Sequence, residues 1–340
     1  MTKHTYSDKT LCIHNQQVRV DPHRALAAPL YQTSTFIFDD AAQGAARFAG
    51  EEAGYIYSRL GNPTVRELEQ RLAALEQTED AAACATGMGA VSAATMSFLS
   101  AGDHLIASST VYGCTYALFS HLLTRYGVEV SFVDFSDIDA IKAARRDNTK
   151  MVFVETPANP NMQVYDLEKI CAFAKAHNLI SVVDNTFLTP MLQKPIKQGA
   201  DLVVHSATKY LNGHGDVVAG LVCGSSEHID TIKYTVLKDI GATMSPFDAW
   251  LILRGLKTLS VRMKAHCEGA HQVARYLAQH DKVAKVYFPG LEDDPGHTLI
   301  GTQMVDAGGV IAFELAASLQ QTEHFINSLT LCTLAVSLGD

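Results

Sequence analysis

The stretch DLVVHSATKYLNGHGD, residues 201–216, decides where the fold and its chemistry meet. It begins with an apolar run rich in β-branched residues, which predicts a strand buried on both faces of a sheet. Ser206, Thr208 and Lys209 follow at the end of this run. A buried lysine carries a heavy desolvation cost. Lys209 therefore either reaches solvent, as most lysines do, or takes part in the chemistry of the protein.

Outward from this stretch, similar apolar runs recur along the chain. Helix-length segments such as 88–99, 113–125 and 167–177 separate most of them. This alternation predicts an α/β fold with a mostly parallel sheet. The segment GNPTVRELEQRLAALEQ predicts a helix that Asn62 caps, with Pro63 in its first turn. The predicted strands are 81–85, 104–107, 128–133, 151–155, 180–184, 201–205 and 218–223.

The periodic pattern divides the chain into three regions. Residues 1–60 have few periodic runs and form an N-terminal extended arm, and residues 61–255 form the large α/β domain. Residues 256–340 form a smaller α+β domain. Around this last boundary, we expect a long helical segment from about 246 to 279, strands at 283–287 and 309–315, and a helix near 319–329.

Composition limits the classes of protein to consider. The 340 residues are 47% hydrophobic and carry a net charge of −9, which argues against nucleic acid or an anionic membrane as the main partner. The seven cysteines are an odd number without a C-x-x-C pair, which indicates reduced thiols in the cytoplasm. The uncharged segment 81–102 is rich in Ala, Gly, Ser and Thr, and fits a strand, a turn and a helix better than a membrane span.

Three unusual segments follow predicted strands, at the edge where open α/β sheets bind ligands. The glycine turn TGMGA (86–90) leads into a helix whose free N–H groups can bind an anion, and Asp184 ends an apolar strand. Singly, these features are typical of a turn, a helix cap and an exposed lysine. Together with Ser206, Thr208 and Lys209 they predict a pyridoxal phosphate site. There the lysine forms a Schiff base, the acid keeps the pyridine nitrogen protonated, and the turn and hydroxyls bind the phosphate.

Other classes of protein fit less well. A nicotinamide-dependent oxidoreductase needs a G-x-G-x-x-G turn early in the chain, which is absent. A non-catalytic scaffold of the same fold would have lost Lys209, and this chain has kept it. The histidines do not fall at metal-ligand spacing, so no metal is expected; those considered are His205, His214, His266 and His271.

At this level of detail the chain resembles the Cys/Met-metabolism family of pyridoxal phosphate enzymes, of aspartate-aminotransferase-like fold. The matching stretches extend over nearly the whole chain. They are YSRLGNPT (57–64), ETPANP (155–160), VVDNTF (182–187), HSATKYLNGHGD (205–216) and SPFDAWLILRGLKTL (245–259).

The resemblance implies roles for residues around the cofactor ring. Lys209 is expected to be the Schiff-base lysine and proton shuttle, and Asp184 to pair with the pyridinium nitrogen. Tyr112 is expected to stack on the ring and to protonate the leaving group, and Asn159 to contact the ring hydroxyl. Without the resemblance, Tyr112 and Asn159 would be interpreted as surface-loop residues.

The resemblance also implies how phosphate and substrate are held. The backbone N–H groups of Gly87 and Met88 are expected to bind the phosphate with Ser206 and Thr208. Ser337 matches a residue near the substrate carboxylate.

An assembly follows from the same resemblance. Tyr57 and Arg59, in the N-terminal arm, are expected to reach the phosphate in a neighbouring subunit, since the arginine fork suits an anion. The active unit is therefore expected to be at least a dimer, and a homotetramer is the expected form.

A small group of residues bears on the substrate. Cys114 follows Tyr112 by two residues, and Lys238 and Asp239 precede the shared S-P-F segment. A compact thiol can lie beside a thioether sulfur, and Lys238 could join a hydrogen-bond chain through Cys114 and Tyr112. This pattern favours family members that release a thiol from methionine. Members that act on cystathionine or O-acetylhomoserine remain the alternative, and Cys114 alone is typical of a small buried thiol.

The end of the chain departs from the family pattern. Relatives are expected to continue beyond LAVSLGD, through a stretch with an arginine that binds the substrate carboxylate. No residue here matches that arginine, so the 340 residues are expected to be an incomplete copy of a longer protein and the C-terminal domain to be incomplete.

Overall fold

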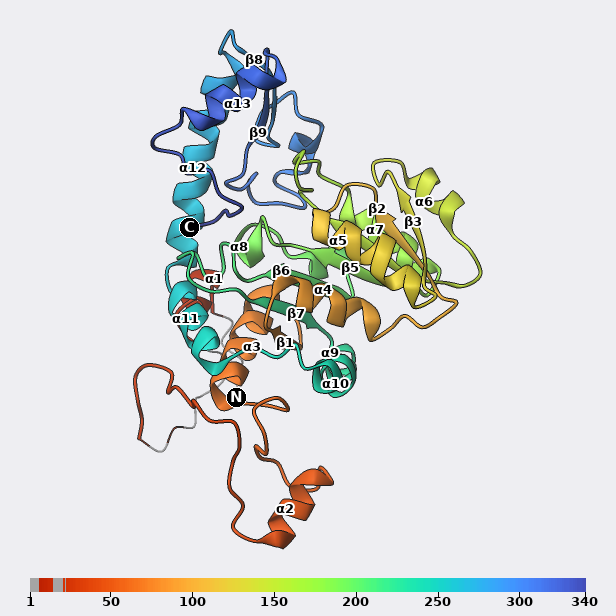
Figure 1. The fold of residues 1–340 in the computed structure, drawn as a ribbon, viewed down its shortest axis with the longest axis vertical. Helices are drawn as coiled ribbons and strands as arrows, with labels where there is room; N and C mark the ends of the chain where they lie inside the picture. Colours follow the sequence, from red (N-terminus) through yellow and green to blue (C-terminus); the bar gives the residue numbers. More distant parts are fainter. Residues whose placement is uncertain (1–5, 15–20, 22) are drawn as a thin grey trace.

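The strands of the chain assemble into one seven-stranded sheet and one small hairpin-like pair. The computed structural model describes residues 6–14, 21 and 23–340 (Figure 1). In the large sheet, in the order β1-β7-β6-β5-β4-β2-β3, strand β7 is antiparallel to both neighbours and the other pairs are parallel. The predicted α/β fold with a mostly parallel sheet is confirmed. The strands are β1 (Asp80–Cys84), β2 (His104–Ser108), β3 (Glu129–Val133), β4 (Thr149–Glu155), β5 (Ile180–Asp184), β6 (Leu202–Ser206) and β7 (Gly220–Gly224).

The register of the central strands fixes which side chains share a face. Asp184, at the end of β5, pairs with Glu155 at the end of β4 and with Val204 on β6. Side chains in register on neighbouring strands point to the same face, and successive residues alternate between faces. Asp184 and Glu155 therefore lie on one face of the sheet, while His205 points to the other.

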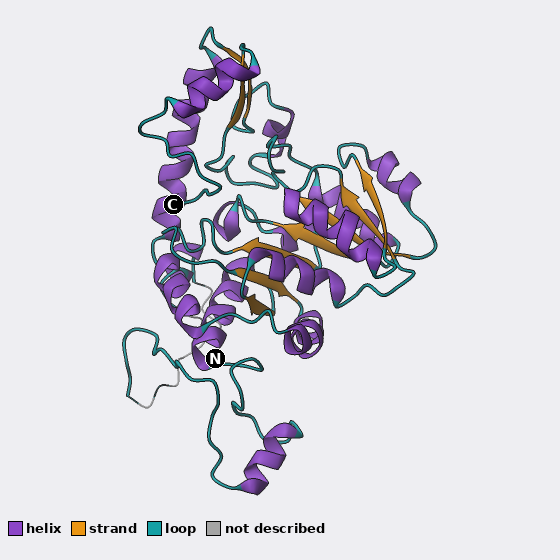
Figure 2. Ribbon diagram, viewed as in Figure 1, coloured by secondary structure: helices purple, strands orange, loops and turns teal. Residues whose placement is uncertain are grey.

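Helices cover both faces of the large sheet (Figure 2). Helix α3 packs on one face against β1 and β7, and α4 packs on the other against β6 and β7. Asn62 caps α3 as predicted, because its side chain accepts a hydrogen bond from the Thr64 N–H at 2.9 Å, with Pro63 in the first turn. The helices of this region are α3 (Pro63–Glu76), α4 (Gly87–Met96), α5 (Gly113–Ala117), α6 (Ile138–Ala144), α7 (Leu167–Ala176), α8 (Thr189–Leu192), η2 (Pro195–Gln198), α9 (Ser226–Ile232) and α10 (Lys238–Ile240).

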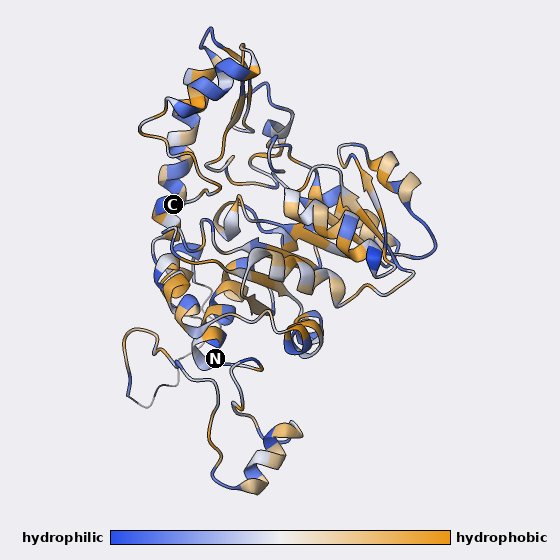
Figure 3. Ribbon diagram, in the orientation of Figure 1, coloured by the Kyte–Doolittle hydropathy of each residue, from blue (hydrophilic) through white to orange (hydrophobic). Residues whose placement is uncertain are grey.

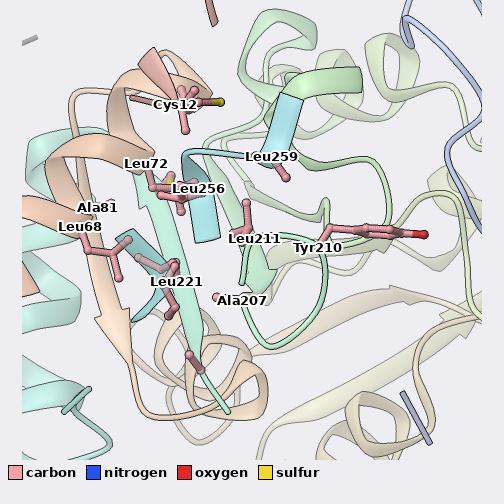
Figure 4. Close-up of a cluster of buried hydrophobic side chains, with 14 of the residues drawn as sticks. Cys12, Leu68, Leu72, Ala81, Ala207, Tyr210, Leu211, Leu221, Leu256 and Leu259 are labelled. Carbon is pink, nitrogen blue, oxygen red and sulfur yellow. The ribbon is translucent and has the colours of Figure 1, made fainter. Parts of the chain in front are cut away.

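The α3 face of the sheet carries a large apolar cluster (Figure 4). Leu72 of α3, Leu221 of β7 and Leu256 of α11 (Pro246–Leu256) are fully buried in it. Burying a leucine side chain contributes roughly 1.5–3 kcal/mol, so this cluster joins elements that are far apart in sequence. The strands of the central sheet are correspondingly hydrophobic (Figure 3).

The predicted long helix over 246–279 is two helices in the structure, α11 (Pro246–Leu256) and α12 (Leu259–Ala278). The carbonyl of Gly255 accepts hydrogen bonds from the Thr258 hydroxyl and the Arg262 guanidinium, both at 3.1 Å. Gly255 also lies so close to the Asn212 carbonyl that a Cβ atom would come within 2.2 Å of it. The Thr258 N–H donates to the Gly255 carbonyl at 3.1 Å, so a tight turn with added side-chain donors ends α11 at this point.

Two helices pass directly into π-helical turns. Helix α5 continues as η1 (Leu118–Leu123), and α9 continues as η3 (Lys233–Leu237), which leads into α10. In such turns each hydrogen bond joins residues five apart along the chain instead of four, and they are frequent near functional sites. Among the described helices, none is long and apolar enough to cross a membrane.

Helix α2 (Ala41–Phe48) and the strand pair of the C-terminal region lie at opposite ends of the molecule in Figure 1. The N-terminal segment, predicted as irregular, also contains α1 (Asp8–Leu11), which packs against α3, whereas α2 projects away from the sheet. The C-terminal region contains an antiparallel pair of strands, a short 3₁₀ helix and one α-helix without buried residues. Its elements are β8 (Val283–Tyr287), η4 (Pro295–Leu299), β9 (Ala312–Leu315) and α13 (Leu319–Asn327).

Candidate active site

A cavity of about 390 Å³ lies at the edge where the parallel strands end. Its walls come from the ends of β4, β5 and β6, the start of α4, and segments before α5 and near the chain end. Nine of the predicted site residues line it: Gly87, Met88, Tyr112, Asn159, Asp184, Ser206, Thr208, Lys209 and Ser337. The five that are not part of the lining are Tyr57, Arg59, Cys114, Lys238 and Asp239.

The start of α4 forms one end of the cavity. Thr86 caps the helix, because its hydroxyl accepts a hydrogen bond from the Gly89 N–H at 2.8 Å. The N–H groups of Gly87 and Met88 belong to the first helical turn, whose donors have no carbonyl partners in the helix. Ser206 lies against this turn, and a Cβ on Gly87 would be 2.8 Å from the Ser206 side chain. Glycine thus keeps open a cradle that favours an anion at the positive end of the helix.

Thr208 lies beside this cradle on the turn after β6. Its hydroxyl accepts a hydrogen bond from the Ala219 N–H at 2.9 Å and approaches the Ala219 carbonyl at 3.3 Å. The segment before β7 therefore holds the Thr208 side chain at the cavity wall. The Thr208 hydroxyl is therefore a second hydroxyl, after that of Ser206, close to the start of α4.

Asp184 lies on the floor of the cavity and is not a helix cap. The N–H and hydroxyl of Thr186 donate to its Oδ1 at 3.0 and 2.6 Å, which leaves Oδ2 available to a donor in the cavity. Burial raises the pKa of the Asp184 carboxyl, whereas the Thr186 hydrogen bonds and the charge of His205 act in the opposite direction. A cationic ring nitrogen in the cavity would stabilise the ionised carboxylate further.

Glu155 is a cavity residue that the sequence analysis did not single out, although it opens the matching stretch ETPANP. Its Oε2 accepts a hydrogen bond from the Tyr112 N–H at 2.6 Å, and its Oε1 accepts one from the Asn159 N–H at 3.2 Å. Burial and the neighbouring Asp184 raise the pKa of Glu155 well above its ordinary value. Glu155 ties together the two loops that carry Tyr112 and Asn159. A charged residue at the end of an apolar strand was the available signal, as it was for Asp184.

Lys209 lines the cavity and is half-buried, so it does not extend freely into solvent. Its N–H donates to the Ser206 carbonyl at 3.2 Å, and its carbonyl accepts from the Gly213 N–H at 2.8 Å. These bonds form the tight turn that follows β6. Ser206, Thr208 and Lys209 therefore face the same cavity that Asp184 reaches from the neighbouring strand.

Tyr112 lies at the outer wall, where the sequence analysis placed a chain of hydrogen bonds. The Cys114 thiol, two residues along the chain, and burial raise the pKa of the Tyr112 phenol. The ammonium group of Lys238 pairs with Asp239 at 3.3 Å, and the described contacts give it no bond to Cys114. The hydrogen-bond chain from Tyr112 through Cys114 to Lys238 therefore stays a prediction.

Tyr57 and Arg59 lie in the exposed arm. The Arg59 guanidinium stands 5.3 Å from the centre of the Tyr57 ring and donates a hydrogen bond to the Lys238 carbonyl. Neither residue reaches the cavity of its own chain. Their predicted contact with a neighbouring subunit's phosphate stays a prediction.

Comparison with known proteins decides the family. The family model "Cys/Met metabolism PLP-dependent enzyme" matches residues 9–340. The chain belongs to this family. It is 52% identical over 337 residues to the L-methionine gamma-lyase of Fusobacterium nucleatum subsp. polymorphum, which covers 98% of this chain and 85% of that protein.

Two further relatives show the breadth of the family. The cystathionine beta-lyase of Lactococcus lactis subsp. cremoris is 43% identical over 98% of this chain and 85% of its own length. The solved structure of a putative O-acetylhomoserine (thiol)-lyase from Campylobacter jejuni superposes with a TM-score of 0.94 at 33% identity, over 98% of this chain and 91% of that one. That structure carries pyridoxyl-lysine phosphate.

The cofactor of the family is pyridoxal phosphate, and the cavity fits it. The cradle between Gly87 and Ser206, which any side chain on residue 87 would fill, suits the phosphate group. Asp184 presents a carboxylate to the floor for the ring nitrogen, and Lys209 supplies an amine for the aldehyde. The residues present therefore match a phosphate at one end and a protonated ring at the other.

Proposed function

We propose that this chain is a pyridoxal phosphate-dependent carbon–sulfur lyase of the methionine γ-lyase type. It converts methionine and water to methanethiol, 2-oxobutanoate and ammonia. The observation that carries the proposal is 52% identity to a methionine γ-lyase over 98% of the chain. The influence of the Cys114 thiol, which raises the pKa of Tyr112 from two residues away, supports it, because a thiol beside a proton donor suits a thioether sulfur.

Each cavity residue has a definite task in this proposal. When bound, pyridoxal phosphate withdraws electrons from the substrate's α-carbon. Lys209 holds the cofactor through its Nζ atom and, once released by substrate, takes the α-proton on that atom. Asp184 holds the ring nitrogen protonated through Oδ2. Asn159 contacts the ring hydroxyl, and Ser337 lies where the substrate carboxylate would bind.

The phosphate and the leaving group occupy opposite ends of the cavity. The N–H groups of Gly87 and Met88, with the hydroxyls of Ser206 and Thr208, bind the phosphate. The Tyr112 ring stacks on the cofactor, and its hydroxyl donates a proton to the departing sulfur. Because the pKa of this phenol is raised, the proton is present throughout the neutral and mildly alkaline range.

A panel of sulfur amino acids tests the proposal. The enzyme should release methanethiol from methionine faster than it cleaves cystathionine, measured with a thiol reagent and by 2-oxobutanoate formation. The absence of methanethiol would favour the alternative, a cystathionine γ-lyase or an O-acetylhomoserine sulfhydrylase. This alternative is supported by the 43% identity to a cystathionine β-lyase and by the fold shared with an O-acetylhomoserine (thiol)-lyase.

We also propose that the active unit is at least a dimer, with a homotetramer as the complete assembly. Leu26, Ile37 and Phe48 of the arm are 99%, 93% and 70% exposed, which is unusual for large apolar side chains. Tyr57 and Arg59 lie in the same arm, away from the cavity of their own chain. Sedimentation analysis of the holoenzyme measures the assembly directly.

The domain boundaries and the location of the protein are further parts of the proposal. An arm over 1–60, a large domain over 61–255 and a C-terminal region over 256–340 should appear as fragments in limited proteolysis. The cytoplasm, where thiols stay reduced, is the proposed location, because all seven cysteines are free in the structure. Cell fractionation tests this location.

A further inference from the structure

A buried pair of titratable side chains lies behind the cavity floor. His205 on β6 and Glu76 at the end of α3 have fully buried side chains, and His205 Nε2 lies 2.6 Å from Glu76 Oε1. Neither residue lines the cavity. His205 points to the α3 face of the sheet, opposite the face on which Asp184 lies, so the pair approaches the cofactor site from the far side.

The pair is joined to the strand end that carries Asp184. Asn185, the next residue, donates from Nδ2 to the same Glu76 Oε1 at 3.0 Å, and its own N–H bonds the Val204 carbonyl on β6. Gln193 donates from Nε2 to Asn185 Oδ1 at 3.0 Å and to the Thr156 carbonyl at 3.1 Å. The ends of β4 and β5 are therefore fixed from behind by one continuous set of buried hydrogen bonds.

The same network extends to the C-terminal region. Gln303 donates to Gln193 Oε1 at 3.0 Å and to the Tyr165 carbonyl, also at 3.0 Å. Its Oε1 accepts a hydrogen bond from the Leu167 N–H at 2.8 Å. A network in which nearly every polar group is paired holds its members in one arrangement.

The charge of the pair is what sets it apart from a purely structural network. Within the part of the chain that the structure describes, Glu76 Oε2 and His205 Nδ1 have no hydrogen-bond partner. A buried carboxylate with two donors on one oxygen is costly unless a positive charge accompanies it. The electrostatic influence of His205 lowers the pKa of the Asp184 carboxyl across the sheet.

We propose that the Glu76–His205 pair is a positioning and charge-balancing support for Asp184, which keeps that carboxylate ionised beneath the cofactor ring. Asp184 needs such support because it is largely withdrawn from solvent and has a second carboxyl, Glu155, in register on the next strand. The inference rests on the proposed role of Asp184. The titratable or charged groups around Asp184 are Glu155 on β4, His205 on β6, Lys209 after β6, Glu76 on α3 and Tyr112 before α5.

The test compares variants of the full-length holoenzyme. His205→Gln removes the imidazole, and Glu76→Gln keeps the shape and an acceptor but removes the carboxylate that His205 bonds. Retention of pyridoxal phosphate is measured by dialysis and visible absorption over a falling pH series. Losing the influence of His205, directly in His205→Gln and through its lost carboxylate partner in Glu76→Gln, lets Asp184 take up a proton at higher pH. The acid midpoint of cofactor release should therefore rise by about one pH unit in both variants. The cofactor dissociation constant at neutral pH should rise about tenfold.

The matched control is His104→Gln. His104 is also a fully buried strand histidine, bonded through Nδ1 to Thr149 at 2.8 Å and through Nε2 to Ser131 at 2.9 Å, but it lies at the start of β2. It should leave the acid midpoint unchanged even where it lowers the melting temperature. An unmoved midpoint in folded Glu76→Gln and His205→Gln, or an equal rise in His104→Gln, overturns the proposal.

Asp184→Asn separates this inference from the function on which it rests. Loss of cofactor retention at all pH values in Asp184→Asn supports the role of Asp184. If Asp184→Asn keeps the cofactor with an unchanged profile, the assigned site is wrong and the inference falls with it. If Asp184→Asn fails to hold cofactor while the Glu76 and His205 variants behave as the wild type, only the inference is wrong.

Discussion

The cavity edge of the sheet and the N-terminal arm differ in how many of their contacts a single chain provides. At the cavity edge, Glu155 is buried, Asp184 is half-buried, and both accept hydrogen bonds from neighbouring residues of the same chain. In the arm, Ile37 and Phe48 leave most of their apolar surface uncovered. The comparison suggests that one chain builds the floor for the cofactor ring, and that the arm becomes useful only against a second chain. The four predictions below test this division.

The largest effect is expected from Lys209→Ala. Because the cofactor is attached through this amine, the variant should lose at least about 10³-fold in kcat and lose the visible band that borohydride reduction fixes to the wild-type enzyme. Absorption spectroscopy and kcat measure both effects. Lys264→Ala is the control, since this lysine is exposed on α12 and pairs with Glu268 at 3.7 Å. A borohydride-fixed cofactor in Lys209→Ala would show that the lysine is assigned wrongly.

Arg59→Ala tests whether the arm serves another chain. Removing a charge-assisted contact with the phosphate should weaken activity by about 1.5–3 kcal/mol, which is roughly ten- to hundredfold. Mixing Arg59→Ala with Lys209→Ala chains should restore part of the activity, because one site of a mixed dimer then has both an intact arm and an intact lysine. The readout is activity of purified mixed dimers. Confirmed mixed dimers without recovery would place Arg59 in its own chain's site.

Cys114→Gly sharpens the view that the outer wall, rather than the floor, determines the substrate. The methionine rate should fall more than the cystathionine rate, with a difference in barrier of roughly 1–3 kcal/mol. Because the Cys114 contact raises the pKa of Tyr112, its loss should also move the alkaline limb of activity to lower pH. The measurement is kcat/KM for both substrates across pH.

The control for this variant is Cys332→Ser, an exposed thiol in the C-terminal region. It should leave both rates and the alkaline limb as in the wild type. An equal loss on both substrates in Cys114→Gly would remove the argument for methionine.

The smallest effect is expected from Gly87→Ala, which tests whether the cradle between Gly87 and Ser206 of a single chain binds the phosphate. The added Cβ would lie 2.8 Å from the Ser206 side chain, so the cradle should narrow and cofactor affinity should fall by about 1–2 kcal/mol. Fluorescence titration of the apoenzyme with pyridoxal phosphate measures it. Gly269→Ala in α12, where no atom lies within 4 Å of the new Cβ, should bind as the wild type does. Unchanged affinity in Gly87→Ala would mean that the phosphate binds elsewhere.

Much of the large domain could be predicted from the sequence, because its strands are continuous apolar runs. The predicted strand over 180–184 agrees with β5, and the run over 201–205 differs from β6 by one residue. The reversed direction of β7 was not predictable, since an apolar run has the same pattern in either direction. The break between α11 and α12 depends on Arg262 and the Asn212 carbonyl reaching Gly255 from other turns, which no local pattern reveals.

The residues of the site also fall into those that the sequence could predict and those that it could not. Residues that follow buried strands, such as Asp184 and Lys209, could be found because a polar residue there is unusual. Glu155 stands in an equivalent position at the end of β4, and the same signal marks it. Lys238 pairs with its neighbour Asp239, and its link to Cys114 stays a prediction. Side-chain pairing on exposed loops depends on geometry that spacing along the chain does not determine.

The two π-helical turns have a consequence for how the chain can change length. Helix η1 follows the segment with Tyr112 and Cys114, and η3 ends directly before Lys238. Removing one residue from a regular α-helix rotates everything beyond it by about 100°. A π-helical turn can instead become an α-helical turn, so that it absorbs the deletion locally. Insertions and deletions in these two segments could therefore alter the substrate wall during evolution while the strand ends beneath the cofactor keep their register.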